Sequence, residues 1–425
     1  MQSLADADFI QALESGPAQW RQDWQAKRLS ALLQWLSDKP WWKAWTHSRM
    51  GPASHAAALS GLPIMGRADY RRLIESHDPI APLEHGSMSM YSSSGSSGVP
   101  VQFWRTALAL RINASHYWAD HRRQGRNLHE RMGIITGYTG HHSGTHRVDQ
   151  GEPWLHPGVQ LARLSTAFSL EEHTLWVCSQ PMSYLVTTPA TLAGVLSTLN
   201  QLNLRPPTIK QILTTSYSVD PELRANARSV FQASIRDRYS CEEFGPIAFQ
   251  CPESDDHYHC AVANVIVEVV DPSGQLVASG QQGEVLATSL HQWASPAVRY
   301  ELGDIATWHS QCPGCGCTVP ALSQLMGRKY FLLKTRDGSW RHIRLLSKQW
   351  LACAPFKEYR LVQKDKESFR AEFVLDHPLT DLESDLLLKM LTQLVGKEFN
   401  FELAQMNAIP WPQGRKRQEF VGLMQ

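Results

Sequence analysis

The chain has 425 residues, enough for two or three domains, and its 41 basic and 40 acidic side chains leave a formal net charge of +1. This balance argues against general nucleic-acid binding, which needs a basic surface. No segment approaches the roughly 18 uninterrupted apolar residues of a membrane span. The polar, acidic start, Met1 to Asp6, lacks the pattern of a signal peptide. We therefore expect a globular, cytoplasmic protein without membrane or nucleic-acid partners.

The first ninety residues are rich in tryptophan and have a helical pattern. Leucines recur at spacings of three and four, which is typical of a helix with one face toward a core: Leu29, Leu32, Leu33 and Leu36. The segment 61–64 breaks this pattern, and a second helix is predicted from Ala68 to Ser76.

A run of serine and glycine follows between Tyr91 and Val101, with the sequence Y-S-S-S-G-S-S-G-V-P-V. Glycines let backbone N–H groups approach a ligand and serines add short donors, so such a loop can wrap phosphate oxygens. The run lacks the Gly-Lys-Ser/Thr ending of a P-loop. Composition alone favours a flexible linker, but apolar sequence resumes at once at Phe103 and Trp104. A helix after it, through Ile112 and Trp118, predicts the order loop and then helix that often holds phosphates.

From about Arg131 short apolar runs alternate with helical stretches. Strands are predicted at 133–137, 175–178 and 209–213, and helices at 189–202 and 221–234. Asp220 is the expected N-cap of the last helix, with Pro221 in its first position. Strand–helix alternation predicts a layered α/β domain with a largely parallel sheet.

Beyond residue 260 the pattern is typical of β-hairpins. The run 265–270 leads into the turn sequence Asp271-Pro272-Ser273-Gly274, and strand character returns at 276–277 and 283–288. A barrel-like β-subdomain is predicted between about 260 and 325. The last hundred residues combine strands at 359–362 and 370–374 with a helix at 382–395, which predicts a small α+β domain.

Five of the eight cysteines lie in two short segments, 251–260 and 312–317. Cys312 and Cys315 have the two-residue gap with which two thiolates grip one Zn²⁺. The segment 251–260 offers further ligands, and the preferred set is Cys251, His257, Cys312 and Cys315. His259, Cys260 and Cys317 remain in reserve, and free cysteines in a reducing cytosol are the alternative.

Five short motifs, in this order, resemble those of the adenylate-forming (ANL) superfamily, and especially its phenylacetate–coenzyme A ligase branch. They are S-S-G-S-S-G-V-P at 93–100, Y-S-C-E-E-F-G at 239–245, R-Y-E-L-G-D at 299–304, G-R-K-Y-F-L-L-K at 327–334 and G-R-K-R-Q-E-F at 414–420. The resemblance covers nearly the whole chain. It implies a large multi-layered α/β domain with parallel sheets and a β-subdomain at 1–328, and a small mobile α+β domain at 329–425.

The resemblance also implies roles for individual residues. The loop would cradle the outer phosphates of ATP with Ser93, Ser94, Gly95, Ser96, Ser97 and Gly98. Glu243 matches a Mg²⁺-binding glutamate, Tyr239 an aromatic near the adenine, Asp304 the aspartate that accepts the ribose hydroxyls, and Arg328 a hinge arginine. Ser216 lies in the segment that takes the place of the adenine-contacting strand end. The acid pocket would be lined from 137–146, including Tyr138, Gly140 and His141.

Lys416 is the expected catalytic lysine when the chain is aligned on Phe420, whereas alignment on Gly414 favours Arg415. Departures from the family pattern are Val99 for a loop lysine, Glu242 for a threonine or serine, and Tyr330 and Phe331 for hinge acids. The sequence alone does not reveal what offsets the charge of Glu242.

The implied function is ATP- and Mg²⁺-dependent activation of a carboxylic acid, and Tyr138 and Trp154 are compatible with an aryl acid without identifying one. The acyl group would then pass to a thiol of coenzyme A or a carrier protein, and structural zinc is also implied. Transfer to an amine and a non-catalytic, zinc-stabilised member are the alternatives. The sequence names neither the acid nor the acceptor, and it leaves the choice between monomer and homodimer open.

Overall fold

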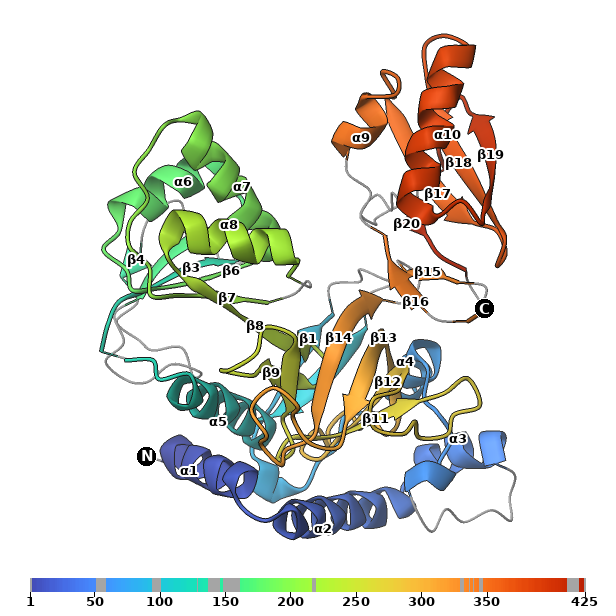
Figure 1. Ribbon diagram of the computed structural model, residues 1–425. Helices are drawn as coiled ribbons and strands as arrows, with labels where there is room; N and C mark the ends of the chain where they lie inside the picture. The colour runs from blue at the N-terminus through green and yellow to red at the C-terminus, as the bar shows by residue number, and fades with distance from the viewer. Residues whose placement is uncertain are drawn as a thin grey trace. The chain divides into compact units, whose positions relative to one another are not determined.

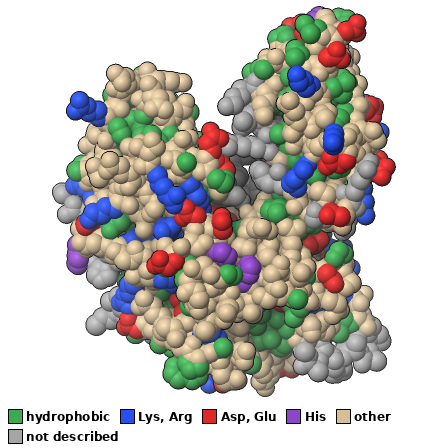
Figure 2. All heavy atoms as spheres, in the orientation of Figure 1, with side chains coloured by type: hydrophobic (Ala, Val, Ile, Leu, Met, Phe, Trp, Pro, Cys, Tyr) green, Lys and Arg blue, Asp and Glu red, His purple; other side chains and the backbone are tan. Residues whose placement is uncertain are grey.

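The computed structural model describes residues 2–50, 59–93, 101–127, 129–136, 146–147, 161–215, 219–328, 332–335, 337–338, 340–343, 347–410 and 420–423. The chain divides into two compact units. The first contains Met1–Ser92, Gln102–Glu301 and Thr307–Leu325, and the second contains Ser93–Val101, Leu302–Ala306 and Met326–Gln425. Each unit is described by itself. Over the face drawn in Figure 2, basic and acidic side chains are interspersed, as expected from the balanced charge.

Helices open the first unit: α1 (Gln2–Ser15), α2 (Ala18–Ser37), α3 (Pro40–Met50) and α4 (Arg67–Glu75), with short 3-10 turns at Leu59–Gly61 and Leu83–His85. Leu32 and Leu36 of α2 are fully buried, which confirms the predicted leucine face. Helix α1 packs on α5 (Ala107–Arg123) through Ile10, Leu13 and Trp118. Within the described residues no helix has both the length and the apolar character that a membrane crossing requires.

A hairpin of β1 (Met88–Ser92) and β2 (Gln102–Thr106) flanks the serine–glycine run. The helix predicted after the run is confirmed as α5, but β2 lies between the run and this helix. Phe103 and Thr106 of β2 are buried, whereas Gln102 is exposed. Thr106 then caps α5 by accepting a hydrogen bond from the backbone of Ala109.

The central sheet has twelve strands in the order β11-β12-β13-β14-β10-β9-β8-β7-β6-β3-β5-β4 (Figure 1). Its parallel half contains β3 (Met132–Thr136), β5 (Leu161–Ser165), β6 (Tyr184–Thr187), β7 (Gln211–Thr214) and β8 (Ser234–Cys241), and the short strand β4 (His146–Arg147) pairs antiparallel at its edge. One face carries α6 (Leu170–Ser179), α7 (Pro189–Gln201) and α8 (Pro221–Phe231). The predicted α/β class is confirmed, although the sheet, predicted to be largely parallel, is parallel only in the part formed by β5, β3, β6, β7 and β8.

The strand predicted at 175–178 is wrong, because these residues belong to α6. Ser169 and Glu172 form a capping box that starts the helix. Leu175 is exposed whereas Trp176 and Val177 are buried, so the apolar run is one turn of helix crossing a core face. The predicted N-cap Asp220 is confirmed, since its side chain accepts a hydrogen bond from the backbone of Leu223.

The remaining strands of the sheet are β9 (Gly245–Gln250), β10 (His257–Cys260), β11 (Val265–Val270), β12 (Gln282–Ser289), β13 (Tyr300–His309) and β14 (Ala321–Arg328). The strands predicted beyond residue 260 are present, but they do not form a separate barrel-like subdomain, because they continue the parallel half through β8 in one twelve-stranded sheet. Strands β11 and β12 pair antiparallel on both sides of the predicted turn at 271–274.

The second unit has a small sheet in the order β19-β18-β17-β20, formed by Asn400–Gln405, Ser368–Val374, Glu358–Gln363 and Phe420–Val421. Helix α10 (Asp381–Val395) buries Leu387, Leu391 and Val395 in the same core as Phe369 and Phe373. A two-stranded ribbon of β15 (Leu332–Lys334) and β16 (Trp340–His342) and the short helix α9 (Ser347–Leu351) complete the described part. The 328/329 domain boundary remains a prediction.

Candidate active site

The tight turn between β8 and β9 carries the two glutamates of the second motif, Glu242 and Glu243. Cys241 and Gly245 pair across this turn. Gly245 has a φ of 74°, in the region that favours glycine, and a Cβ there would collide with the side chain of Asn113 on α5. The turn is therefore held both by its own backbone and by the helix packed against it.

Glu243 is a buried carboxylate with a cationic partner. Its relative exposure is only 4%, and its Oε1 lies 3.3 Å from Nη1 of Arg67 at the start of α4. Burial, and then the charge of Glu243, raises the pKa of the neighbouring Tyr70 well above its usual value. Sequence reasoning missed Arg67, because a single arginine at a helix start has no distinctive pattern.

Three predicted site segments begin at one edge of the parallel sheet. Strands β3, β7 and β8 run in the same direction, so their carboxyl ends lie at the same edge, where open α/β sheets bind ligands. The segments that follow these ends are 137–145, 216–218 and the turn 242–244. Tyr138, Gly140, His141 and Ser216 themselves lie outside the described residues.

The phosphate-loop candidate is described only at its ends. The backbone N–H of Ser93 donates to the carbonyl of Val101, and the N–H of Val101 donates to Oγ of Ser93, both at 2.9 Å. These bonds close the loop directly after β1 and before β2. Ser94, Gly95, Ser96, Ser97 and Gly98 lie outside the described residues.

The other nucleotide-site candidates lie on separate strands. Tyr239 is half-buried on β8, at a bulge between Tyr239 and Ser240. Asp304 is buried on β13, and Arg328 is the last residue of β14. Lys416 and Arg415 lie outside the described residues, so their relation to the site stays a prediction.

Four potential metal ligands converge at the side of the antiparallel half. The ligand atoms of Cys251, His259, Cys312 and Cys315 all lie within 4.8 Å of one another. Sγ of Cys315 is 3.3 Å from Nε2 of His259, close to the roughly 3.5 Å that two ligands of one tetrahedral zinc ion would have. Burial lowers the pKa of His259 to about 4, so this imidazole is neutral at pH 7, the form that binds metals. The donor set fits Zn²⁺.

The histidine of this group differs from the predicted one. His259 pairs with Ala321 across β10 and β14, and Ala321 packs on Cys251 and Cys312. His257 lies two residues earlier on the strand, and its Nδ1 is 2.7 Å from Oγ of Ser254. The choice of His257 is therefore corrected to His259, because the strand register brings the later histidine to the cysteines.

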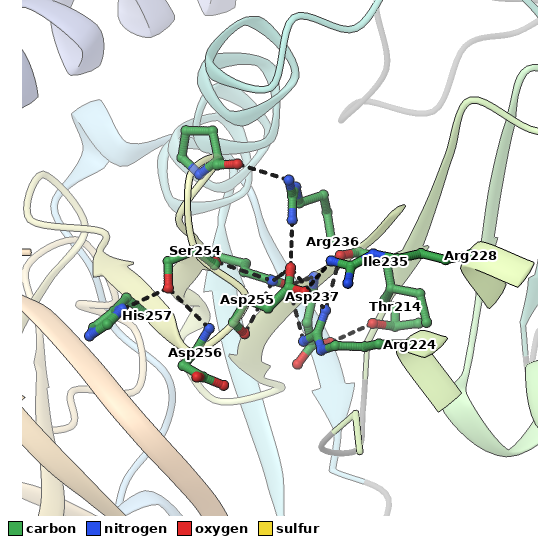
Figure 3. Close-up of polar contacts among 12 residues, drawn as sticks. Thr214, Arg224, Arg228, Ile235, Arg236, Asp237, Ser254, Asp255, Asp256 and His257 are labelled. Atoms are coloured by element: carbon green, nitrogen blue, oxygen red, sulfur yellow. Dashed lines mark hydrogen bonds and ion pairs between the residues drawn. The ribbon is translucent and has the colours of Figure 1, made fainter. Parts of the chain in front are cut away.

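The loop after Cys251 is fastened to the parallel half by ion pairs. Figure 3 shows Asp255 between three arginines. Arg228 of α8 pairs with Oδ2, Arg236 of β8 donates to Oδ1 at 3.0 Å, and Arg224 lies 3.9 Å away. These contacts position the loop that leads from Cys251 to the β10 histidine.

Asp237 is the buried acid of the same region. Its Oδ1 accepts from Thr214 at the carboxyl end of β7 (2.7 Å), and its Oδ2 accepts from Tyr258 on β10 (2.9 Å). Its backbone N–H donates to Oε1 of Gln250 on β9 at 2.6 Å. Burial raises its pKa to about 6, even though these hydrogen bonds favour the ionised form. The network connects the carboxyl end of β7 to the strand that carries His259.

Known proteins resemble this chain in both sequence and fold. It is 24% identical over 295 residues to phenylacetate–coenzyme A ligase of Pseudomonas putida and 24% over 232 residues to that of Aromatoleum evansii. The match to the first relative covers 63% of that protein's length and 65% of this chain. The match to the second covers 49% of that protein and 51% of this chain. No known family profile matches the chain.

Among solved structures, 2-hydroxyisobutyryl-CoA ligase with 2-HIB-AMP in the postadenylation state superposes with a TM-score of 0.67 at 15% identity, covering 97% of this chain and 91% of that one. An open conformation of the same ligase with 2-HIB-AMP and CoA gives 0.64 at 16% identity, with 97% and 93% covered. O-succinylbenzoate coenzyme A synthetase of Bacillus subtilis, in complex with AMP, gives 0.51 at 16%, with 77% and 67% covered.

The fold is that of the adenylate-forming ligases. Both the fold and the sequence relatives agree with the resemblance to the adenylate-forming superfamily that the motifs indicated. Within that superfamily, the relatives matched by sequence are phenylacetate–coenzyme A ligases.

A pH-dependent stability is expected from Asp237. Between about pH 4 and 6 its folded carboxyl holds a proton that an unfolded aspartate, whose ordinary pKa is 3.8, has lost. The free energy of unfolding therefore falls as pH rises through this window, by about 2–3 kcal/mol. Asp237→Asn removes this contribution. As the pH rises from 4 to 7, the melting temperature of the native chain should therefore fall relative to that of the variant.

The exposed Asp78 offers a matched control, since Asp78→Asn should follow the native profile. Parallel melting curves for Asp237→Asn and the native chain across this range would show that Asp237 carries no such proton.

Proposed function

We propose that the chain is an ATP-dependent acid–thiol ligase. It activates a carboxylic acid, of aryl type, to an acyl-adenylate with release of pyrophosphate, and it then transfers the acyl group to a thiol. The observation that carries the proposal is the buried Glu243 in the β8–β9 turn, beside Arg67 and at the edge where three predicted site segments begin. The five ordered motifs and the adenylate-forming fold support it.

The chemistry is in-line attack of a carboxylate on the α-phosphate, for which the protein mainly positions groups and neutralises charge. One buried carboxylate together with substrate phosphates suits Mg²⁺, which prefers few protein ligands and would neutralise the phosphate oxygens when bound to Glu243. Arg67 holds the Glu243 carboxylate in place without that cation. Asp304 would accept the ribose hydroxyls, and Tyr239 would contact the adenine.

Coenzyme A is the acceptor that best fits the proposal, because the sequence relatives are coenzyme A ligases and one structural neighbour was solved with CoA. A carrier-protein thiol and an amine are the alternative acceptors. Arg328 at the end of β14 would mark the entrance to the hinge of a mobile C-terminal domain at 329–425.

We further propose a structural zinc ion held by Cys251, His259, Cys312 and Cys315. Cys251, Cys312 and His259 are buried, and the knuckle is tightened by backbone hydrogen bonds from Cys312 to Cys317 and from Gly316 to Cys312, both 2.9 Å. Gly314 leaves room for this close packing, because a Cβ there would lie 2.7 Å from Cβ of Ser254. Four protein ligands make a closed site, which clamps loops and leaves no position for a substrate.

A pyrophosphate-release screen tests the ligase activity. The purified chain with ATP and Mg²⁺ should release pyrophosphate with at least one acid from a panel of aryl, amino-aryl and fatty acids. Acceptor competition between coenzyme A and amines then identifies the second substrate. If calorimetry detects no ATP binding and no acid gives turnover, while added pyrophosphate is detected normally, the chain is the non-catalytic alternative.

Lys416→Ala should slow acyl-adenylate formation by about 100-fold or more, because it removes a cation from the developing charge. The same variant should still use a ready-made acyl-adenylate as a donor. Arg415→Ala is the matched variant, since the alternative alignment exchanges the two roles. Unimpaired pyrophosphate release by Lys416→Ala would contradict the assignment.

The native chain should contain about one zinc ion, as measured by inductively coupled plasma mass spectrometry. His259→Ala should lower both this zinc content and the melting temperature. His257→Ala, on the same strand, should keep its zinc. Equal losses in both variants would mean that the geometry selects the wrong histidine, and well under one zinc in the native chain would reject the site.

A further inference from the structure

Arg105 is a largely covered arginine in the hairpin that flanks the phosphate-loop candidate. It lies on β2, and its guanidinium carbon is 4.5 Å from the ring centroid of Tyr91 and 5.4 Å from that of Phe103. Only 11% of its side chain is exposed. A guanidinium that stacks on aromatic rings keeps its charge and loses little freedom when it makes a further contact.

The contact that Arg105 makes is with Glu242, the residue at which the chain departs from its family. Nη2 of Arg105 donates to the backbone carbonyl of Glu242 and lies 3.4 Å from its Oε2. The Glu242 carboxylate is itself 57% exposed. Arg105 is therefore the less exposed partner of the pair, and the Glu242 side chain is the solvated one.

The two adjacent glutamates of the β8–β9 turn thus have separate arginines. Arg67 comes from α4 and pairs with Glu243, and Arg105 comes from β2 and pairs with Glu242. An uncompensated Glu242 would add a negative charge beside the proposed Mg²⁺ ligand and would repel a triphosphate. Its pairing offsets this charge from outside the loop, in which Val99 replaces the usual lysine.

We propose that Arg105 is a positioning residue that neutralises Glu242, so that the Glu242–Glu243 turn can accept Mg²⁺-bound ATP. This inference rests on the proposed function. Arg105 also fastens the β1–β2 hairpin to the same turn through its bond to the Glu242 carbonyl. The two roles are separable, because the bond to the Glu242 carbonyl survives replacement of the Glu242 side chain.

A double-mutant cycle of Arg105→Met and Glu242→Thr tests the charge role. In the native background, Arg105→Met should raise the KM for ATP by about tenfold, with a smaller change in kcat. The Glu242→Thr background has no carboxylate to compensate. There, Arg105→Met should raise the KM for ATP by no more than about twofold. The effect of Arg105→Met should shrink at high ionic strength, because the Glu242 carboxylate is exposed to screening ions.

Two further variants keep the result interpretable. Arg105→Lys keeps the charge and should recover part of the ATP affinity even if Arg105→Met folds poorly. Arg71→Met breaks an exposed ion pair with Glu75 on α4 and should leave ATP use unchanged.

Equal losses from Arg105→Met in both backgrounds would overturn the proposal, because a purely structural anchor would act equally with and without Glu242. No change in either background would also overturn it. If the native chain itself neither binds nor turns over ATP, the proposed ligase function fails, which is a different outcome from a failed cycle in an active enzyme.

Discussion

The change of partner along strand β8 is the constraint on which the rest of the first unit depends. Residues 234–237 pair in parallel with β7, whereas residues 238–241 pair antiparallel with β9. One strand therefore joins the parallel and antiparallel halves of the twelve-stranded sheet. Its carboxyl end leads into the turn with Glu243, so the position of the candidate site follows from how the halves are joined.

Asp237 lies at the point where β8 changes partner. Its N–H donates to the side chain of Gln250, and its carboxyl group receives hydroxyls from Thr214 and Tyr258, one on each side of the junction. The buried acid thus satisfies polar groups that a regular ladder does not reach, and the raised pKa is the cost of placing it there.

The sequence predicted those features that have a local cause. Asp220 and Pro221 start α8, and leucine spacing identifies the buried face of α2. The mistake at 175–178 came from reading a short apolar run without the Ser169–Glu172 capping box before it. Arg67, Arg105 and His259 depend on contacts between distant elements, and no spacing in the sequence encodes the register that brings His259, not His257, to the cysteines.

The shared strand also has a consequence for dividing the chain. A fragment that ends after α8 would keep β7 but lose β8, and so would present the fully buried Ile212 and Leu213 beside an open row of backbone donors and acceptors. Such an edge invites pairing between molecules. A fragment that ends after α8 is therefore not a complete domain, and a split protein would have to carry β8 in its first piece.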